Sequence, residues 1–197
     1  MASKTVQQKT SGFALLMTLV VVTVLISIGL AVVELTLKQV RLSTNAKESE
    51  AAFHAANAGV ECARYIRRIA STTMETGGDL TILDDNNYEC FSAARYTNVK
   101  TNLLSSSDGN VYMYTYGFTW GAKPRCSMMS TIVMAASPTG SGLSFNVGQH
   151  IPGYPSATPK TCNPGERCTV LSSHGYNRTC DSINGYGSIE REVLLQF

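Results

Sequence analysis

The feature that most constrains this chain is an apolar run from Phe13 to Val33 that contains no charged residue. A helix rises about 1.5 Å per residue, so these 21 residues are long enough to cross a hydrocarbon core of about 30 Å. A secretory signal peptide has a shorter apolar region that ends at a small-residue cleavage site, and this run has neither property. We therefore predict a membrane-spanning helix over residues 13–33. Basic residues lie on both sides of this segment: Lys4 and Lys9 precede it, and Lys38, Arg41 and Lys47 follow it. Charge therefore does not set its orientation in the membrane.

The helix is predicted to continue beyond the membrane, so that it covers residues 13–70. Between Glu34 and Ile69 there is no proline and a single glycine, and most residues favour helix. Glu34 is spaced as an i,i+4 ion-pair partner of Lys38. From residue 52 onward, small and apolar residues recur at three- and four-residue steps, which makes this half amphipathic. The predicted packing residues of this stripe are Ala52, Ala55, Ala56, Gly59, Ala63 and Ile66. Small side chains allow another backbone to approach the helix closely. That backbone belongs either to a sheet of the same chain or to neighbouring helices.

The composition changes near residue 70, because all 6 prolines and most of the 16 glycines follow it. Residues 71–197 are predicted to form a β-rich head domain that begins with a turn-rich connector around residues 76–79 and 84–87. Strands are predicted at 111–120, 127–136, 168–173 and 188–197. Residues 137–162 are rich in Gly and Pro, so they form either a long exposed loop or an irregular strand pair. The expected fold class is α+β, with a long N-terminal α-helix packed on a small antiparallel β-sheet.

The strand at 111–120 has the clearest pattern, because large aromatic residues alternate strictly with smaller ones. The aromatic positions are Tyr112, Tyr114, Tyr116, Phe118 and Trp120. Such a face could stack bases, but no basic cluster accompanies it, so we expect core or intersubunit packing. The whole chain has 16 basic and 14 acidic residues, a formal charge of +2. This charge lacks the basic excess that binding to nucleic acid through charge alone needs, so no nucleic-acid partner is predicted.

Six cysteines follow the membrane segment, which indicates an oxidising exterior: Cys62, Cys90, Cys126, Cys162, Cys168 and Cys180. No Cys-x-x-Cys pair or paired histidine spacing completes a zinc site, so disulfides are predicted in place of metal. Fifteen full pairings are conceivable. Cys162 and Cys168 could close a small turn, and Cys180 could join the C-terminal loop to the sheet, but spacing does not decide between the pairings.

No enzymatic activity and no cofactor are predicted, since no motif for a nucleophile elbow, zinc protease, P-loop or dinucleotide site occurs. Ser172, Ser173 and His174 adjoin, but neighbours on a strand point to opposite faces, so they are not interpreted as a nucleophile and its base. One acidic cluster offers oxygen ligands for calcium without the spacing of an EF-hand, and calcium is not favoured. Its members are Asp79, Asp84, Asp85, Asn86 and Asn87.

Lys4, Lys9 and the Ser11-Gly12 pair precede the apolar helix that starts at Phe13. This arrangement resembles the class III leader of type IV prepilins. It implies a leader over residues 1–12 that prepilin peptidase cuts between Gly12 and Phe13, followed by N-methylation of Phe13. The run NAKESEAAFHAANAGVE, residues 45–61, also resembles the Ala-rich N-terminal motif of PilX-type minor pilins. Asn57 departs from that motif, where an acidic residue is common.

A second departure concerns Met17, the fifth residue after the implied cleavage point. Most pilins have a glutamate there, which pairs with the terminal ammonium of a neighbouring subunit and offsets the cost of burying both charges. Met17 cannot form that pair, so the resemblance favours a minor, priming or tip-located pilin over the major subunit. It implies anchoring in the bacterial inner membrane with an exterior C-terminal domain, and then a place in the extracellular pilus. The implied partners are other pilin subunits, contacted through the N-terminal helices, prepilin peptidase and the inner-membrane assembly platform.

Three alternatives remain open at this point. A K-type pseudopilin of type II secretion has the same leader and helix, and K-type pseudopilins also commonly lack the glutamate. A single-span surface adhesin or receptor would never be processed. A transmembrane enzyme would have a pocket with convergent titratable groups.

Overall fold

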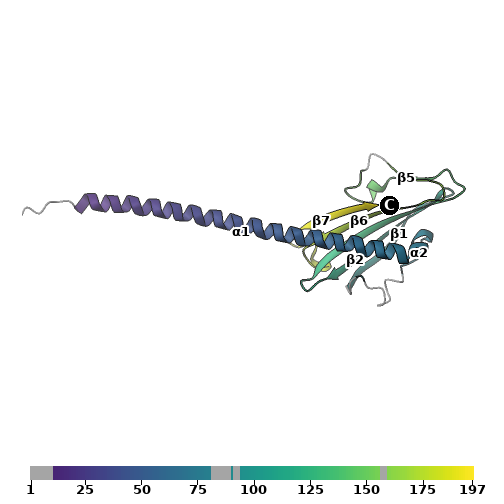
Figure 1. Cartoon of the computed structure of the whole chain (residues 1–197), viewed down its shortest axis with the longest axis horizontal. Helices are drawn as coiled ribbons and strands as arrows, with labels where there is room; N and C mark the ends of the chain where they lie inside the picture. Colours follow the sequence, from purple (N-terminus) through teal and green to yellow (C-terminus); the bar gives the residue numbers. More distant parts are fainter. Residues whose placement is uncertain (1–10, 81–89, 91–93, 156–158) are drawn as a thin grey trace, which may run out of the picture. The chain divides into compact units, whose positions relative to one another are not determined.

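The computed structural model describes residues 11–80, 90, 94–155 and 159–197 of the 197-residue chain. In chain order the elements are α1 (Ser11–Ile69), α2 (Ser71–Thr76), β1 (Ala94–Ser106), β2 (Gly109–Trp120), β3 (Arg125–Ala136), β4 (Leu143–Phe145), η4 (Val147–Gln149), β5 (Lys160–Cys162), β6 (Arg167–Tyr176), η5 (Cys180–Ser182) and β7 (Glu190–Gln196). Figure 1 follows the path of the chain through these elements. The chain divides into two compact units, of which the first ends at Ala46 and the second comprises Lys47–Phe197.

Helix α1 passes without interruption from the first unit into the second, as the absence of proline predicts. Glu34 and Lys38 form the expected i,i+4 ion pair, with an N–O distance of 3.8 Å. Arg67 and Arg68 occupy the last turn of α1, where cations complement the helix dipole. The short helix α2 follows directly, in a region where the sequence predicts only a connector, and it ends at Gly77 in the left-handed conformation.

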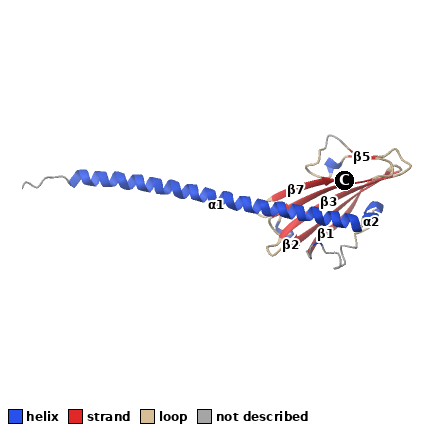
Figure 2. Cartoon of the chain, in the orientation of Figure 1, coloured by secondary structure: helices blue, strands red, loops and turns tan. Residues whose placement is uncertain are grey.

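The second unit contains a five-stranded antiparallel sheet in the order β1-β2-β3-β6-β7. The last part of α1 lies along one face of this sheet, as Figure 2 shows. This arrangement confirms the predicted α+β class. A smaller sheet pairs β4 with β5, with Leu143 opposite Cys162.

The face of the sheet toward α1 holds the aromatic core. Tyr114, Tyr116 and Phe118 are buried there, and Tyr112 and Trp120 pack at its border. From β7, Val193 and Leu195 pack against the same cluster. Of the two roles expected for the aromatic face of β2, core packing is the one that the structure shows.

A second core lies on the opposite face of the sheet, beneath residues 137–162. Leu143, Val147 and Ile151 are buried against side chains of the main sheet, including Ile132 and Val170. Of the two interpretations left open for this stretch, the irregular strand pair is right, because β4 and β5 pair within it. A long exposed loop is wrong for the part that the structure describes.

Strand bounds differ from prediction most at β1 and β6. Strand β1 is not predicted by the sequence at all, and register shifts between Arg95 and Thr97 and between Asn102 and Leu104 interrupt its pairing with β2. Such irregularities remove the period-two pattern that would reveal a strand. Strand β6 continues to Tyr176, three residues beyond the predicted end.

We expect alkaline pH to destabilise the second unit through its buried tyrosines. Burial raises the pKa of Tyr114 to about 12 and also raises that of Tyr116, from an ordinary value of 10. A pKa that is higher in the folded state stabilises the fold below pH 10, and this stabilisation is lost as pH rises through the folded value. The free energy of unfolding, measured by urea titration in detergent micelles, should therefore fall between pH 10 and 12. A Tyr114→Phe variant should lose less over this interval, and a flat profile for the wild type would contradict the prediction.

Candidate assembly surface

Helix α1 exposes a continuous apolar surface over its first half. Its large apolar side chains from Phe13 to Leu42 are all exposed in the isolated chain. Among the described residues, α1 is the helix that is long and apolar enough to cross a membrane. Exposed apolar area on this scale is unfavourable in water, so this segment needs lipid or other apolar helices around it.

The hydroxyl groups within the apolar segment are satisfied inside the helix itself. Thr18 donates to the carbonyl of Leu15 at 2.9 Å, and Thr23 donates to that of Val20 at 2.8 Å. Ser27 donates to the carbonyl of Thr23 at 2.8 Å. Because each hydroxyl proton has an acceptor within the same helix, burial of this segment in an apolar medium leaves no hydroxyl donor unpaired there.

The residues implied in processing lie at the beginning of α1. A side chain at Gly12 would meet no atom within 4 Å, so packing within this chain does not require a glycine there. Phe13 and Met17 are exposed on the helix surface. The lysines of the implied leader, Lys4 and Lys9, lie outside the described residues.

The small-residue stripe of α1 packs against the chain's own sheet. Its predicted members are all buried: Ala52, Ala55, Ala56, Gly59, Ala63 and Ile66. Of the two partners left open by the sequence, the structure shows the sheet of the same chain. The stripe is therefore occupied within the second unit.

Helix and sheet approach each other at backbone distance at two glycines. A Cβ on Gly175 of β6 would lie within 3.0 Å of the backbone of Ala52 and Ala56. A Cβ on Gly59 of α1 would collide with the side chain of Ser173. Only glycine at each point allows this separation, since real Cβ atoms do not approach other atoms so closely.

Hydrogen bonds fix the register of the helix on the sheet. The hydroxyl of Ser127 donates to the carbonyl of Ala55 at 2.6 Å and accepts a hydrogen bond from the indole of Trp120 at 2.9 Å. Farther along, the buried Arg67 donates to Thr169 at 3.0 Å and pairs with Glu75 at 2.7 Å. A buried guanidinium with these partners is compensated, whereas removal of one partner would leave a charge unpaired.

The other face of α1 in the second unit remains exposed. It carries Phe53 and Tyr65 together with i,i+3 and i,i+4 pairs, among them Glu61 with Arg64 at 3.2 Å. Asn57, where the PilX-type motif commonly has an acidic residue, donates to the carbonyl of Phe53 at 3.0 Å. Within the second unit, the chain's own sheet leaves this face of α1 uncovered.

All six cysteines are joined in disulfides: Cys62–Cys90, Cys126–Cys180 and Cys162–Cys168. The first joins α1 to the segment that precedes β1, and the second joins β3 to η5. The third closes the small turn before β6, one of the pairings that the sequence leaves open. Disulfides in all six positions fit an exterior, oxidising location for the second unit.

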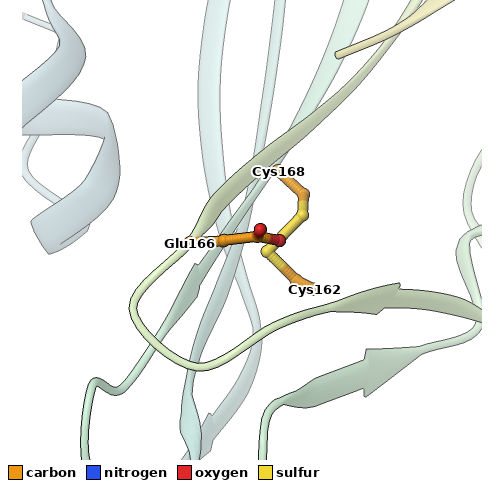
Figure 3. A group of neighbouring side chains, drawn as sticks. All are labelled: Cys162, Glu166 and Cys168. Atoms are coloured by element: carbon orange, nitrogen blue, oxygen red, sulfur yellow. A yellow bond between two sulfur atoms is a disulfide. The ribbon is translucent and has the colours of Figure 1, made fainter.

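Among the described residues, one group of side chains of the types that bind metals lies close together. Glu166 lies beside Cys162 and Cys168, but Figure 3 shows the two sulfur atoms bonded to each other, so neither is a thiolate ligand. In the acidic cluster considered for calcium, Asp79 pairs with Lys100 at 2.8 Å. Its other members, residues 84–87, lie outside the described residues.

Ser172 and His174 do form a hydrogen bond, which the sequence interpretation missed. Residues two apart share a strand face, and the hydroxyl of Ser172 lies 3.1 Å from Nε2 of His174. Glu190 contacts Nδ1 of the same ring. However, Ser172 is fully buried and lies 2.7 Å from an oxygen of Glu192, the acceptor for its proton. The cluster holds β6 to β7 and does not present an activated hydroxyl to a substrate.

Comparison with known proteins adds to this geometry. The PilX N-terminal family model matches residues 11–61, which include the apolar half of α1 and most of the small-residue stripe. No curated protein and no solved structure matches the chain. The family match and the apolar helix fit a membrane-anchored protein that associates with other pilus components. Residues 11–61 are therefore similar to the N-terminal part of PilX-type, type IV pilus-related pilins.

Proposed function

We propose that this protein is a minor pilin that primes a type IV pilus or occupies its tip, and that its mature form begins at Phe13. The observation that carries the proposal is the exposed apolar half of α1, which continues without a break into a small-residue stripe already covered by the chain's own sheet. Such a subunit has one surface for lipid or neighbouring helices and one folded head. Its role is structural.

Removal of a leader by prepilin peptidase is supported by the position of Gly12. The glycine precedes Phe13 directly, and the space around it in the chain would accept a side chain. Its role is therefore assigned to recognition by the peptidase. In this layout residues 1–12 are the leader, residues 13–70 the helix with its membrane span at 13–33, and residues 71–197 the head.

The minor role is supported by Met17 and by the lack of any acidic residue between Phe13 and Val33. No carboxylate in the span can pair with the terminal ammonium of a neighbouring subunit, so that charge would be buried without compensation at every repeat. A subunit used once, with no subunit above it, avoids this cost. We therefore place this protein at the end of the filament.

Assembly follows from the same helix. The protein is first anchored in the inner membrane with its head outside. It then moves into the filament, and its apolar span is transferred from lipid to the equally apolar helices of other pilins. Since both surroundings are apolar, packing and not the hydrophobic effect holds the subunits together. The assembly platform in the inner membrane is the partner that receives it.

Mass spectrometry of the intact protein and of its N-terminal peptide tests this proposal in native membranes and in sheared surface fibres. We expect a chain that begins at N-methyl-Phe13, at low abundance in the fibres relative to the major subunit. A chain that begins at Met1 in every fraction would refute processing and favour a single-span adhesin. A processed chain that copurifies with a secretion system and never with fibres would instead identify a type II pseudopilin.

A further inference from the structure

The two edges of the main sheet differ in how they are protected. Strand β1 has two register shifts in its pairing, and such bulges hinder the addition of another strand. Strand β7 pairs with β6 in an unbroken register. Its first half carries Glu190, Arg191 and Glu192, whereas residues 193–197 have no charged side chain. We call residues 193–197, on the side that faces away from β6, the β7 edge.

The backbone of the β7 edge has donors and acceptors directed outward. Thr169 and Phe197 exchange both backbone hydrogen bonds, at 2.7 and 3.0 Å. Because the bonding direction alternates along an antiparallel strand, Leu195 also bonds toward β6, and Leu194 and Gln196 direct their N–H and C=O groups away from it. In the described part of the chain, β7 has a neighbouring strand on one side only.

A groove flanks the β7 edge on each face of the sheet. On the α1 side, a groove of about 600 Å³ is lined by Leu195 and Phe197 together with side chains from the end of α1. A second groove, of about 350 Å³, is lined by Leu194 and Gln196 of the opposite face together with Leu195, Tyr154 and Pro155. Successive side chains of a strand point to opposite faces, so a strand added here would place them alternately in the two grooves.

The two grooves differ in charge. Arg64, Arg67 and Arg68 line the α1-side groove, and Arg67 is already paired with Glu75. Arg64 has Glu61 at 3.2 Å, while Arg68 is exposed and no described carboxylate pairs with it. The opposite groove is lined by apolar and aromatic surface with one amide. An occupant that matches both grooves has acidic side chains on one face and apolar side chains on the other.

We propose that the β7 edge binds an extended segment of a partner protein, which adds to the sheet as a further strand. Acidic side chains of this segment face Arg68, and its apolar side chains lie against Leu194 and Tyr154. The backbone hydrogen bonds provide affinity, and the alternation of acidic and apolar side chains provides specificity. This surface lies within the second unit, and the proposal does not depend on where the protein stands in a filament.

A peptide-binding experiment on the full chain in detergent micelles tests the proposal. The probe is a labelled ten-residue peptide in which Glu and Val alternate, and fluorescence anisotropy reports its binding. We expect saturable binding with a Kd below about 1 mM. A control peptide in which Lys and Val alternate should bind at least about tenfold more weakly. A Glu–Val peptide with N-methylated amides at alternate positions should bind at least about tenfold more weakly, because it lacks the donors for the edge.

Two variants locate the site. Leu194→Pro removes a backbone N–H that points away from β6, so the hydrogen bonds between β7 and β6 remain. Proline is tolerated at such a position of an edge strand. This variant should weaken binding of the Glu–Val peptide at least about tenfold. Arg68→Glu should weaken binding by a similar factor, whereas Lys123→Glu makes the same charge change at the exposed β2–β3 turn and should leave binding unaltered.

Three results would overturn the proposal. The first is no saturable binding of the Glu–Val peptide to the wild type. The second is equal binding of the acidic and basic peptides, or equal binding by wild type and Arg68→Glu. The third is a concentration-dependent dimer that Leu194→Pro abolishes, which would assign the β7 edge to a second copy of this chain.

Discussion

Replacement of Gly175 by alanine is expected to lower the free energy of unfolding of the second unit by about 3 kcal/mol. The new Cβ would lie within 3.0 Å of backbone atoms of Ala52 and Ala56. Backbone atoms of a helix cannot rotate aside as a side chain can, so α1 would have to move away from β6. That displacement would also lengthen the hydrogen bond from Ser127 to Ala55. Urea unfolding of the full chain in detergent micelles, followed by circular dichroism, measures the loss.

The control for this measurement is Gly185→Ala, also in the second unit. A Cβ on Gly185 meets only the carbonyl of Ser182, at 3.1 Å, and the residue is exposed. We expect this variant to lose less than about 1 kcal/mol. Equal free energies of unfolding for the two alanine variants would contradict the close approach of α1 to β6 at Gly175.

Gly12→Val is expected to stop maturation. A side chain at Gly12 meets nothing within the chain, so the helix should form normally while the peptidase encounters a branched side chain next to the bond that it cuts. We expect the rate of cleavage to fall by at least about 100-fold, equivalent to about 3 kcal/mol of transition-state stabilisation. The full-length chain should accumulate in membranes and be missing from sheared fibres, as measured by intact-mass analysis.

Gly29→Val provides a matched control, because Gly29 is also a helical glycine with no atom near its missing Cβ. The two variants make the same chemical change in the same apolar helix, but only Gly12 adjoins Phe13. Normal cleavage of Gly29→Val and blocked cleavage of Gly12→Val would support the processing site. Normal incorporation of Gly12→Val into fibres would refute it.

The parts of this fold that the sequence predicts are those with a long and regular period. Strand β2 keeps one alternating pattern over its whole length, and α1 has a long apolar run followed by a regular small-residue stripe with no proline between them. The aromatic face of β2 is placed correctly for the same reason. Local pattern is enough wherever a single element determines which side chains are buried.

The remaining features depend on contacts between distant residues. The small-residue stripe specifies a close neighbour without identifying it, and only the fold shows that Gly175 supplies the matching backbone. Cysteine spacing cannot decide among pairings because topology brings Cys126 and Cys180 together across 54 residues. Strand β1 lacks a period because it is irregular, and the grooves beside β7 join residues from α1, β7 and the stretch around Tyr154.

The disulfide between Cys62 and Cys90 gives the head a covalent route for mechanical load. Tension applied along α1 from its N-terminal end would act in shear on the contacts of residues 47–61 with the sheet. At Cys62 the pull would pass directly through the disulfide to Cys90, four residues before β1 begins, bypassing the chain between them. While the disulfide is intact, the residues between the two cysteines are therefore shielded from the load, which reaches the sheet at β1, the strand that follows Cys90.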